Sequence, residues 1–440
     1  MIHYFLKKLL LKSRYERLIK IEKNYAIKVN QVSVEKYQLD RFNHIWRQAQ
    51  RKIPFYRMWQ EKFGLPQQIN SLHDLKKFPL LTKQDVINNI QLIEKTPGAT
   101  RYTLTGGTSG LTTKFPMNHK DAQTAWLNTH LGRRWNGLSH TDSLFMIWGH
   151  SHLFSGRYAK LKQLRRQVKD FVLGIKRMSA YDMSPKHLER IYTELTTTQP
   201  RYIIGYGSCL SLLAKHIEQY GHQNTNSNLK LIVNTSEPIA MSDVELVSRV
   251  FDCPVANEYG MAEAGVIGYS VEQTSRIHVM WQDYILGRKN QEIIITTIGE
   301  RCFPLINYST EDYNAGDDRL SMTEIDSIQG KVRAVLTVGI AGGEKTQLSV
   351  VLLDHILKQL PAISSVHYEQ TSPTKVKVMY FASEPIINSD IIEWLRLHLS
   401  NEGINVRAGA VIAQKIDKPL STLAGKRAPI INNDYYQLKS

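Results

Sequence analysis

Residues Leu104–Phe115, with the sequence Leu-Thr-Gly-Gly-Thr-Ser-Gly-Leu-Thr-Thr-Lys-Phe, form the most informative stretch of the chain. The stretch contains side chains that donate hydrogen bonds, and glycines that let the backbone turn its N–H groups toward a ligand. These residues are Thr105, Gly106, Gly107, Thr108, Ser109, Gly110 and Lys114. Such a loop can turn its N–H groups inward and bind several phosphate oxygens. A flexible polar turn after a strand would have the same composition. The stretch matches neither the Gly-x4-Gly-Lys-Ser/Thr loop of common nucleotide hydrolases nor a Gly-x-Gly-x-x-Gly fingerprint.

Short β-branched runs alternate with amphipathic helices from this loop to about residue 310. Four of these runs have the apolar character of buried strands: Arg201–Tyr206, Leu229–Thr235, Pro254–Tyr259 and Glu292–Thr297. Residues 1–100 are predicted to be mostly helical. This alternation is typical of an α/β fold in which mixed or largely parallel sheets are flanked by helices.

The pattern changes near residues 329–330, where a different alternation begins. It predicts the order strand, helix, strand, strand, helix, strand, over Val332–Val338, Gln347–Leu360, Val366–Gln370, Lys375–Phe381, Ile387–Leu399 and Val406–Ile412. This is an α+β module of about 110 residues, large enough to fold by itself. A chain of 440 residues is also too long for one ordinary core. We therefore predict a large N-terminal domain, 1–329, with a helical region at 1–100, and a small C-terminal domain, 330–440.

The formal net charge of the chain is +16, which suggests an anionic partner or surface. Basic residues concentrate in two regions, Lys7–Lys23 and Arg157–Arg177. Each region is either a solvated helix face or a site of contact with anionic lipid headgroups or a polyanionic substrate. The chain has no zinc-finger, RNA-recognition or helix-turn-helix signature, so no nucleic-acid partner is expected.

The three cysteines, Cys209, Cys253 and Cys302, lie far apart and predict neither a disulfide framework nor a Cys-x-x-Cys zinc site. No run approaches the roughly 18–20 apolar residues that a membrane span needs. The apolar N-terminal run contains charges and no small-residue cleavage site, so it is a poor signal peptide. We expect a cytoplasmic protein, with peripheral contact at the inner face of the membrane if the basic regions bind lipid.

The loop at Leu104–Phe115 resembles the phosphate loop of adenylate-forming enzymes, usually Ser/Thr-Ser-Gly-Thr-Thr-Gly-x-Pro. It is similar to the loop of the phenylacetate–coenzyme A ligase branch and of its relatives encoded with capsular and exopolysaccharide biosynthesis, in which a Lys-Phe pair also follows. Gly106 stands where serine is usual, and Thr112 replaces the proline. Further segments match the branch in the same order: Ile53–Tyr56, Phe78–Asp85, Gly205–Ala214, Asn234–Pro238 and Asn257–Glu263.

The resemblance implies roles for residues in these segments. One matched turn borders the adenine in the family, and here it includes Ser236, Glu237 and Pro238. Tyr259 and Gly260 begin the Tyr-Gly-x-x-Glu signature, whose tyrosine stacks near adenine and whose glutamate, here Glu263, holds magnesium. This agrees with the preference of Mg²⁺ for one or two carboxylates plus phosphate oxygens. Considered alone, Glu263 would be an ordinary glutamate in the first turn of a helix.

The segment Phe303–Asp312 resembles Pro-Leu-Ile-Arg-Tyr-Arg-Thr-Gly-Asp, whose aspartate takes the ribose hydroxyls. The resemblance gives this role to Asp312, although Asn307 replaces an arginine and Glu311 a glycine. A second register exists, because Tyr313–Asp317 also spells Tyr-x-x-Gly-Asp. The apolar strand that leads into Asp312 favours the first register.

The segment Asp417–Arg427 resembles the C-terminal Pro-x-Thr-x-x-Gly-Lys loop of the family. The lysine of that loop bridges the carboxylate and the α-phosphate, so Lys426 is the catalytic candidate; without the resemblance it would be a solvated lysine near a chain end. The segment 330–333 stands where the family has its hinge. Some members of the branch bind zinc through Cys/His clusters, but no cysteine lies near His278, so no zinc is predicted.

Together these features predict an enzyme that uses ATP and Mg²⁺ to convert a carboxylic acid into an acyl-adenylate, with release of pyrophosphate. The acyl acceptor would be coenzyme A, a carrier-protein thiol or the amine of a sugar, and the resemblance implies a role in polysaccharide biosynthesis. The alternative is an inactive homologue that binds nucleotide and acts as a partner at the membrane surface. The departures at Gly106, Thr112, Asn307 and Glu311 favour this alternative, and the retained Glu263 and Lys426 argue against it.

Overall fold

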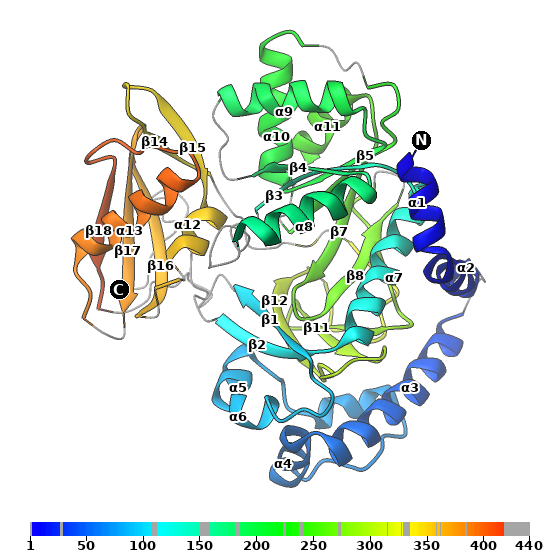
Figure 1. The fold of residues 1–440 in the computed structure, drawn as a ribbon. Coiled ribbons are helices and arrows are strands. Elements are labelled where there is room, and N and C mark those ends of the chain that lie inside the picture. The colour runs from blue at the N-terminus through cyan, green and yellow to red at the C-terminus, as the bar shows by residue number, and fades with distance from the viewer. Residues whose placement is uncertain are drawn as a thin grey trace. The chain divides into compact units, whose positions relative to one another are not determined.

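Figure 1 shows the fold in a computed structural model. The structure describes residues 2–26, 30–106, 112–149, 159–180, 185–222, 226–236, 239, 241–271, 274–314, 316–326, 328, 335–357, 359–360, 362–382 and 385–417. The chain falls into two compact units. The first comprises Met1–Thr105, Thr113–Asp142 and Pro254–Gly330, and the second comprises Gly106–Thr112, Ser143–Cys253 and Lys331–Ser440. The domain boundary at residues 329–330 stays a prediction.

The first unit begins with a succession of helices. Their bounds are α1 (Ile2–Leu10), α2 (Lys12–Ala26), α3 (Gln31–Lys52), α4 (Pro54–Phe63), the 3-10 helix η1 (Leu72–Lys77), α5 (Lys83–Asn88) and α6 (Ile90–Ile93). Helix α3 begins after Asn30, whose side chain caps the first turn. Gln38, fully buried on α3, donates hydrogen bonds to the carbonyls of Trp281 and Tyr284 at 3.0 Å each. These bonds join α3 to the strand region near the end of the unit.

The strands of the first unit are mostly antiparallel. β7 (Val255–Met261), β8 (Gly265–Ser270), β9 (Ile277–Val279) and β13 (Glu324–Ile325) follow the order β13-β9-β8-β7. β10 (Tyr284–Lys289), β11 (Glu292–Thr297) and β12 (Tyr308–Tyr313) form a three-stranded antiparallel sheet. Helix α7 (His119–Trp135) packs against β8, where Gly132 lies directly on the ring of Tyr269 and a Cβ would overlap that ring.

The second unit contains four parallel strands with helices between them. β3 (Leu144–Trp148), β4 (Ile175–Ser179), β5 (Tyr202–Gly205) and β6 (Leu231–Thr235) follow the order β6-β5-β3-β4. The helices are α8 (Ala159–Val172), α9 (Pro185–Thr198), α10 (Gly207–Gln219) and α11 (Met241–Phe251). β5 and β6 are buried along their whole length, as expected of strands covered on both faces. The expected α/β fold with mixed and parallel sheets is confirmed.

The C-terminal residues 335–417 form an α+β module with its own hydrophobic core. Its elements are β14 (Val335–Gly339), β15 (Lys345–Ser349), α12 (Val350–Leu357), β16 (Ile363–Ser372), β17 (Lys375–Ala382), α13 (Asn388–Asn401) and β18 (Val411–Lys415). β14 and β15 form a hairpin, and β16, β17 and β18 form a three-stranded sheet in which β17 and β18 are parallel.

Several predicted boundaries in this module are wrong, among them that of the strand expected at Val366–Gln370, which runs from Ile363 to Ser372. Residues 347–349 belong to strand β15, so the helix expected from Gln347 begins only at Val350. The reason is the turn at Gly342 and Gly343, both with positive φ, which folds the chain back on β14 and imposes alternating burial on the following residues. The last strand starts at Val411, later than the expected Val406.

Lys7 on α1 predicts a pH dependence of stability. Its ammonium group is buried and donates to the carbonyl of Asp142 at 2.7 Å, and burial lowers the pKa of Lys7 from 10.5 to about 8. Between about pH 8 and 10.5 the unfolded chain retains a proton that the folded chain has lost, so stability rises with pH. Relative to Lys7→Met, we expect the free energy of unfolding to increase by about 2 kcal/mol from pH 7.5 to 9.5. Urea unfolding of both proteins at the two pH values measures this difference, and equal increases would contradict it.

Candidate functional site

Strands β7 and β12 of the first unit bring Tyr259 and Asp312 together. The Tyr259 hydroxyl donates to Asp312 Oδ2 at 3.1 Å. Burial, with the nearby charge of Asp312, raises the pKa of Tyr259 well above its usual value, so the hydroxyl stays a donor at physiological pH. An aromatic ring can stack on a planar nucleobase, and a carboxylate beside it can accept hydrogen bonds from two neighbouring hydroxyls of a sugar. Asp317 of the second register is exposed and lies beyond the end of β12.

Glu263 lies in the turn between β7 and β8 and is only 7% exposed. Glu263 does not lie in the first turn of a helix, so an interaction with a helix dipole does not explain this glutamate. The hydroxyl of Tyr308 donates to Glu263 Oε1 at 2.8 Å. Burial and the charge of Glu263 raise the pKa of Tyr308, so this hydroxyl remains a donor that orients the carboxylate. Arg301 supports the same turn by donating to the Glu263 carbonyl at 3.0 Å.

Sequence reasoning assigned no role to Tyr308 or Arg301. Tyr308 lies within the matched segment Phe303–Asp312, so the sequence places it near the site. The sequence does not indicate that its hydroxyl contacts Glu263. Arg301 precedes that segment, and nothing in the local sequence indicates that it reaches Glu263 and, at 2.9 Å, the hydroxyl of Tyr284. Both contacts depend on the packing of β10 and β12 near the turn.

The start of β12 is fixed by Leu81, which belongs to the helical N-terminal region. Leu81 forms a parallel bridge with Tyr308. Its N–H donates to the carbonyl of Asn307 at 2.9 Å, and its carbonyl accepts from Ser309 N–H at 3.0 Å. The matched segment Phe78–Asp85 therefore contacts the strand that carries Asp312.

Glu311 occupies a left-handed backbone conformation, with φ of +60°. The resembled segment has glycine at this position, the residue for which this region of φ is freely accessible. Here the Glu311 carboxylate pairs with the Lys83 ammonium at 2.9 Å, and its N–H donates to Glu292 Oε1 at 3.1 Å. These contacts hold Glu311 in a backbone conformation that glycine adopts easily. The chain therefore keeps the backbone bend of the resembled segment although glutamate replaces its glycine.

Gly260 is required by the close approach of β7 and β8. A Cβ at this position would lie 2.6 Å from the carbonyl oxygen of Gly265, which is backbone and cannot rotate away. Any larger residue would push the two strands apart next to Tyr259 and Glu263.

The remaining predicted site residues are only partly described. Thr105 and Gly106 end β1 (Arg101–Gly106), and Lys114 lies exposed on β2 (Thr112–Met117), 4.0 Å from Glu94. Ser236 directly follows β6 in the second unit, with φ of +67°. The others lie outside the described residues: Gly107, Thr108, Ser109, Gly110, Glu237, Pro238 and Lys426.

The carboxylate of Glu263 has the chemistry of a magnesium ligand. Mg²⁺ takes oxygen ligands and usually one or two carboxylates, with phosphate oxygens and water in the other positions. Glu263 offers a buried carboxylate whose orientation is fixed by the Tyr308 hydroxyl. In the described part of the first unit, this carboxylate and Asp312 can thus serve a metal ion and a sugar, respectively.

Comparison with known proteins relates the chain to acid-activating ligases. No family model matches it. It is 23% identical to the phenylacetate-coenzyme A ligase of Escherichia coli K12 over 347 residues, which cover 72% of this chain and 76% of that protein. Protein CapK of Staphylococcus aureus is 22% identical over 287 residues, or 62% of this chain and 61% of CapK.

Solved structures of 2-hydroxyisobutyryl-CoA ligase share the fold. The open conformation in complex with 2-HIB-AMP and CoA has a TM-score of 0.55 at 17% identity, and the match covers 92% of each chain. The thioesterification state has a TM-score of 0.57 at 18% identity, covering 92% of this chain and 90% of the other. At this level of identity the likeness establishes the fold.

Proposed function

Because the chain is a relative of the phenylacetate–coenzyme A ligases within the adenylate-forming enzymes, we propose that it activates a carboxylic acid with ATP. The observation that carries this proposal is that, within the first unit, the Tyr259 hydroxyl contacts Asp312 and the Tyr308 hydroxyl contacts Glu263. The resembled motifs assign Tyr259 to adenine, Asp312 to the ribose hydroxyls and Glu263 to magnesium, and Tyr308 is the partner that the structure adds. The homology and the geometry therefore support the same chemistry.

The proposed reaction has two steps. A carboxylate oxygen of the acid attacks the α-phosphorus of ATP, the bond from that phosphorus to the β-phosphate oxygen breaks, and pyrophosphate leaves. A thiol of coenzyme A then loses its proton and attacks the acyl carbon, and the bond to AMP breaks to give a thioester. The first step joins two anions, so the site must stabilise negative charge in the transition state.

We assign this stabilisation to a small set of groups. Thr105–Gly110 and Lys114 would contact the phosphates, and Ser236, Glu237 and Pro238 would border the adenine beside Tyr259 and Gly260. Asp312 would accept hydrogen bonds from the ribose hydroxyls. Glu263 would hold Mg²⁺, which supplies positive charge to the phosphates. Lys426, on the small C-terminal domain predicted at 330–440, would bridge the acid and the α-phosphate.

The acceptor and the biological setting rest on the relatives. 2-Hydroxyisobutyryl-CoA ligase is seen with CoA and an acyl-adenylate, which supports coenzyme A as the acceptor; a carrier thiol or an amino sugar would react at the same acyl carbon. The similarity to CapK supports a role in cell-surface polysaccharide biosynthesis. We place the reaction in the cytoplasm, where ATP and coenzyme A are supplied.

Exchange of labelled pyrophosphate into ATP tests the first step. We expect at least one acid in a panel of aryl, hydroxy and short-chain acids to support exchange, and Lys426→Ala to abolish most of it. If no acid supports exchange although the protein binds ATP, the chain is a nucleotide-binding homologue without catalysis. If Lys426→Ala exchanges as fast as the unchanged protein, the adenylation mechanism described here is wrong.

Tyr308→Phe tests whether Tyr308 positions the Glu263 carboxylate. Removing a buried hydroxyl that donates to a charged group costs roughly 1–3 kcal/mol, so we expect a roughly tenfold higher Mg²⁺ concentration for half-maximal exchange. The KM for the acid should change little, since Tyr308 is proposed to act through Glu263. Tyr313→Phe, a partly exposed tyrosine of the same strand, is the control. An unchanged Mg²⁺ dependence in Tyr308→Phe would contradict this role.

Helix α8 provides the observation behind a peripheral membrane contact. Leu164, Val168 and Phe171 lie at helical spacing and are 57%, 57% and 63% exposed. Arg165 and Lys169 are exposed beside them. An exposed apolar stripe flanked by basic side chains is typical of helices that lie in an anionic membrane surface. Among the described residues, no helix is long and apolar enough to span a membrane.

We therefore expect the protein to sediment with vesicles that contain phosphatidylglycerol and not with vesicles of phosphatidylcholine alone. The double variant Leu164→Ser/Phe171→Ser should bind at least about tenfold more weakly, because two apolar side chains no longer enter the membrane. Leu397→Ser, which changes an exposed leucine of α13, should bind as the unchanged protein does. Binding that is equal for both lipids, or unaffected by the double variant, would exclude this contact.

A further inference from the structure

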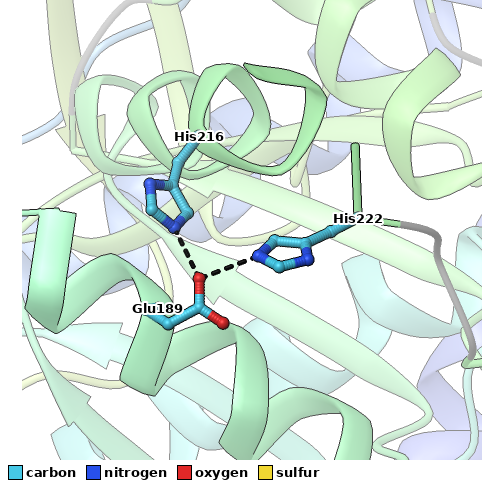
Figure 2. A group of neighbouring side chains, drawn as sticks. All are labelled: Glu189, His216 and His222. Atoms are coloured by element: carbon cyan, nitrogen blue, oxygen red, sulfur yellow. Dashed lines mark hydrogen bonds and ion pairs between the residues drawn. The ribbon is translucent and has the colours of Figure 1, made fainter. Parts of the chain in front are cut away.

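A cluster in the second unit brings together one carboxylate and two imidazoles that the proposed adenylation site does not use (Figure 2). Glu189 lies on α9, His216 lies near the end of α10, and His222 follows that helix. Glu189 Oε2 is 3.0 Å from His216 Nε2 and 2.8 Å from His222 Nε2. Both rings therefore direct the same nitrogen at the same oxygen atom.

Neighbouring aromatic rings fix the orientation of both histidines. The Tyr192 ring stacks on His222 with centroids 4.2 Å apart and an angle of 11° between the planes. The Tyr220 ring lies 4.6 Å from His216. The side chain of His216 is only 5% exposed, whereas those of His222 and Glu189 are 26% and 46% exposed. The cluster thus has a buried wall and an open side toward solvent.

We propose that Glu189, His216 and His222 bind a divalent transition-metal ion of the Zn²⁺ class. Two imidazole nitrogens and one carboxylate oxygen are a donor set that suits Zn²⁺, with water in the fourth position. The three ligand atoms already lie within 4.8 Å of one another. Zinc bonds of about 2.0–2.1 Å place tetrahedral ligand atoms about 3.3 Å apart, so small side-chain rotations complete the site.

Zinc would replace the protons that the Nε2 atoms share with the carboxylate. Without an ion, both neutral rings can donate an Nε2 hydrogen to Glu189 Oε2, at the 3.0 and 2.8 Å distances of the structure. Metal binding needs a lone pair on each Nε2, so the hydrogen of each neutral ring moves to Nδ1 while the Glu189 oxygen turns to the ion. Nearby cations have other partners, since Arg249 pairs with Glu218 and Lys215 with Asp243.

The proposed role of the ion is to fasten α9 to the end of α10. The ligands come from two helices and a following segment, so one ion would cross-link parts of the chain 27 and 33 residues apart. Such a cross-link stabilises the folded state by the free energy of metal binding, because the unfolded chain has no preformed site. This proposal is independent of the adenylation chemistry.

The test uses the untagged 440-residue chain, stripped of metal with a chelator, and Zn²⁺ alone as the probe. Competition with a chromophoric chelator should give one equivalent of zinc with a Kd below about 1 µM. Glu189→Gln keeps an oxygen that accepts a hydrogen bond but removes the charge, and we expect it to weaken binding at least tenfold. His222→Ala, which removes a partly exposed ligand, should weaken it by at least as much.

Two controls isolate the cluster from other histidines and carboxylates. Glu194→Gln changes a neighbouring carboxylate of α9 that pairs with Lys176, and His398→Ala removes a histidine of α13. Both should keep the full equivalent of zinc and the increase in Tm that zinc produces. The bound ion should also be replaceable by Co²⁺, with the visible absorption of a tetrahedral cobalt site that is lost in His222→Ala. Less than half an equivalent of tight zinc, or equal binding by Glu189→Gln and Glu194→Gln, would show that the three residues form only a hydrogen-bonded cluster.

Discussion

Glu263→Gln is expected to lower acid-dependent pyrophosphate exchange by roughly 10²- to 10³-fold, an effect comparable to the removal of one preorganised electrostatic group. The substitution keeps the size of the side chain and its ability to accept the hydrogen bond from Tyr308, which is 2.8 Å long in the structure. It removes the negative charge that would hold Mg²⁺ against the phosphates. The fold should therefore survive while the step that depends on the ion is lost.

Glu292→Gln is the matched control for this variant. Glu292 is also partly buried and also accepts a hydrogen bond from a β12 hydroxyl, that of Ser309. Its variant should retain exchange within about threefold of the unchanged protein, since no charge next to the phosphates is altered. Exchange measured at several Mg²⁺ concentrations separates weaker metal binding from unfolding. A Glu263→Gln protein as active as Glu292→Gln would remove Glu263 from the mechanism.

Gly132→Ala is expected to destabilise the first unit, although the same substitution stabilises most helices. In an ordinary helix interior, replacing glycine with alanine stabilises by about 1 kcal/mol. On α7 the new Cβ would overlap the ring of Tyr269, which is fully buried on β8. Overpacking of this kind costs about 1–3 kcal/mol, and the gain in helix propensity offsets only part of it. We expect a net loss of about 1–2 kcal/mol, measured by denaturant unfolding.

A double-mutant cycle shows whether the ring is the cause. In the background of Tyr269→Ala, which removes the ring, Gly132→Ala should be neutral or stabilising, so the two substitutions should couple by more than about 1 kcal/mol. Thr129→Ala on the same helix adds no atoms and should behave alike in both backgrounds. Additive effects of Gly132→Ala and Tyr269→Ala would show that the cost arises elsewhere.

The class of fold was predictable because apolar periodicity is a local property. The buried strands at Arg201–Tyr206 and Leu229–Thr235 correspond to β5 and β6, with ends that differ by a few residues. The hairpin that contains β15 was missed, since its strand continues without a break into α12 and the run was assigned to the helix alone. Boundaries of this kind are set by pairing with another strand, here β14, and not by the residues themselves.

The candidate site was predictable only in part. Tyr259, Glu263 and Asp312 follow from sequence motifs, and the structure brings Tyr259 and Asp312 into hydrogen-bond contact. The roles of Gly107–Gly110 and Lys426 stay predictions. Glu311 was identified only as a replacement of the family's glycine; its positive φ and its ion pair with Lys83 are not indicated by any local pattern. The cluster of Glu189, His216 and His222 could not be predicted from the sequence, because its members lie 27 and 33 residues apart and share no short motif.

The bridge between Leu81 and Tyr308 has a consequence for synthesis of the protein. Asn307, next to this bridge, donates through its side chain to the carbonyl of Phe78, 229 residues earlier in the chain. At ribosomal rates of roughly 5–20 residues per second, the segment around Leu81 waits about 10–45 s for its strand partner to be made. During that time Leu81 lacks its strand partner, while Phe78 already has Phe42 and Trp46 as neighbours. The N-terminal helical region is thus synthesised early but pairs with β12 only after that strand has been made. Chaperone binding to the nascent chain should be strongest in this interval.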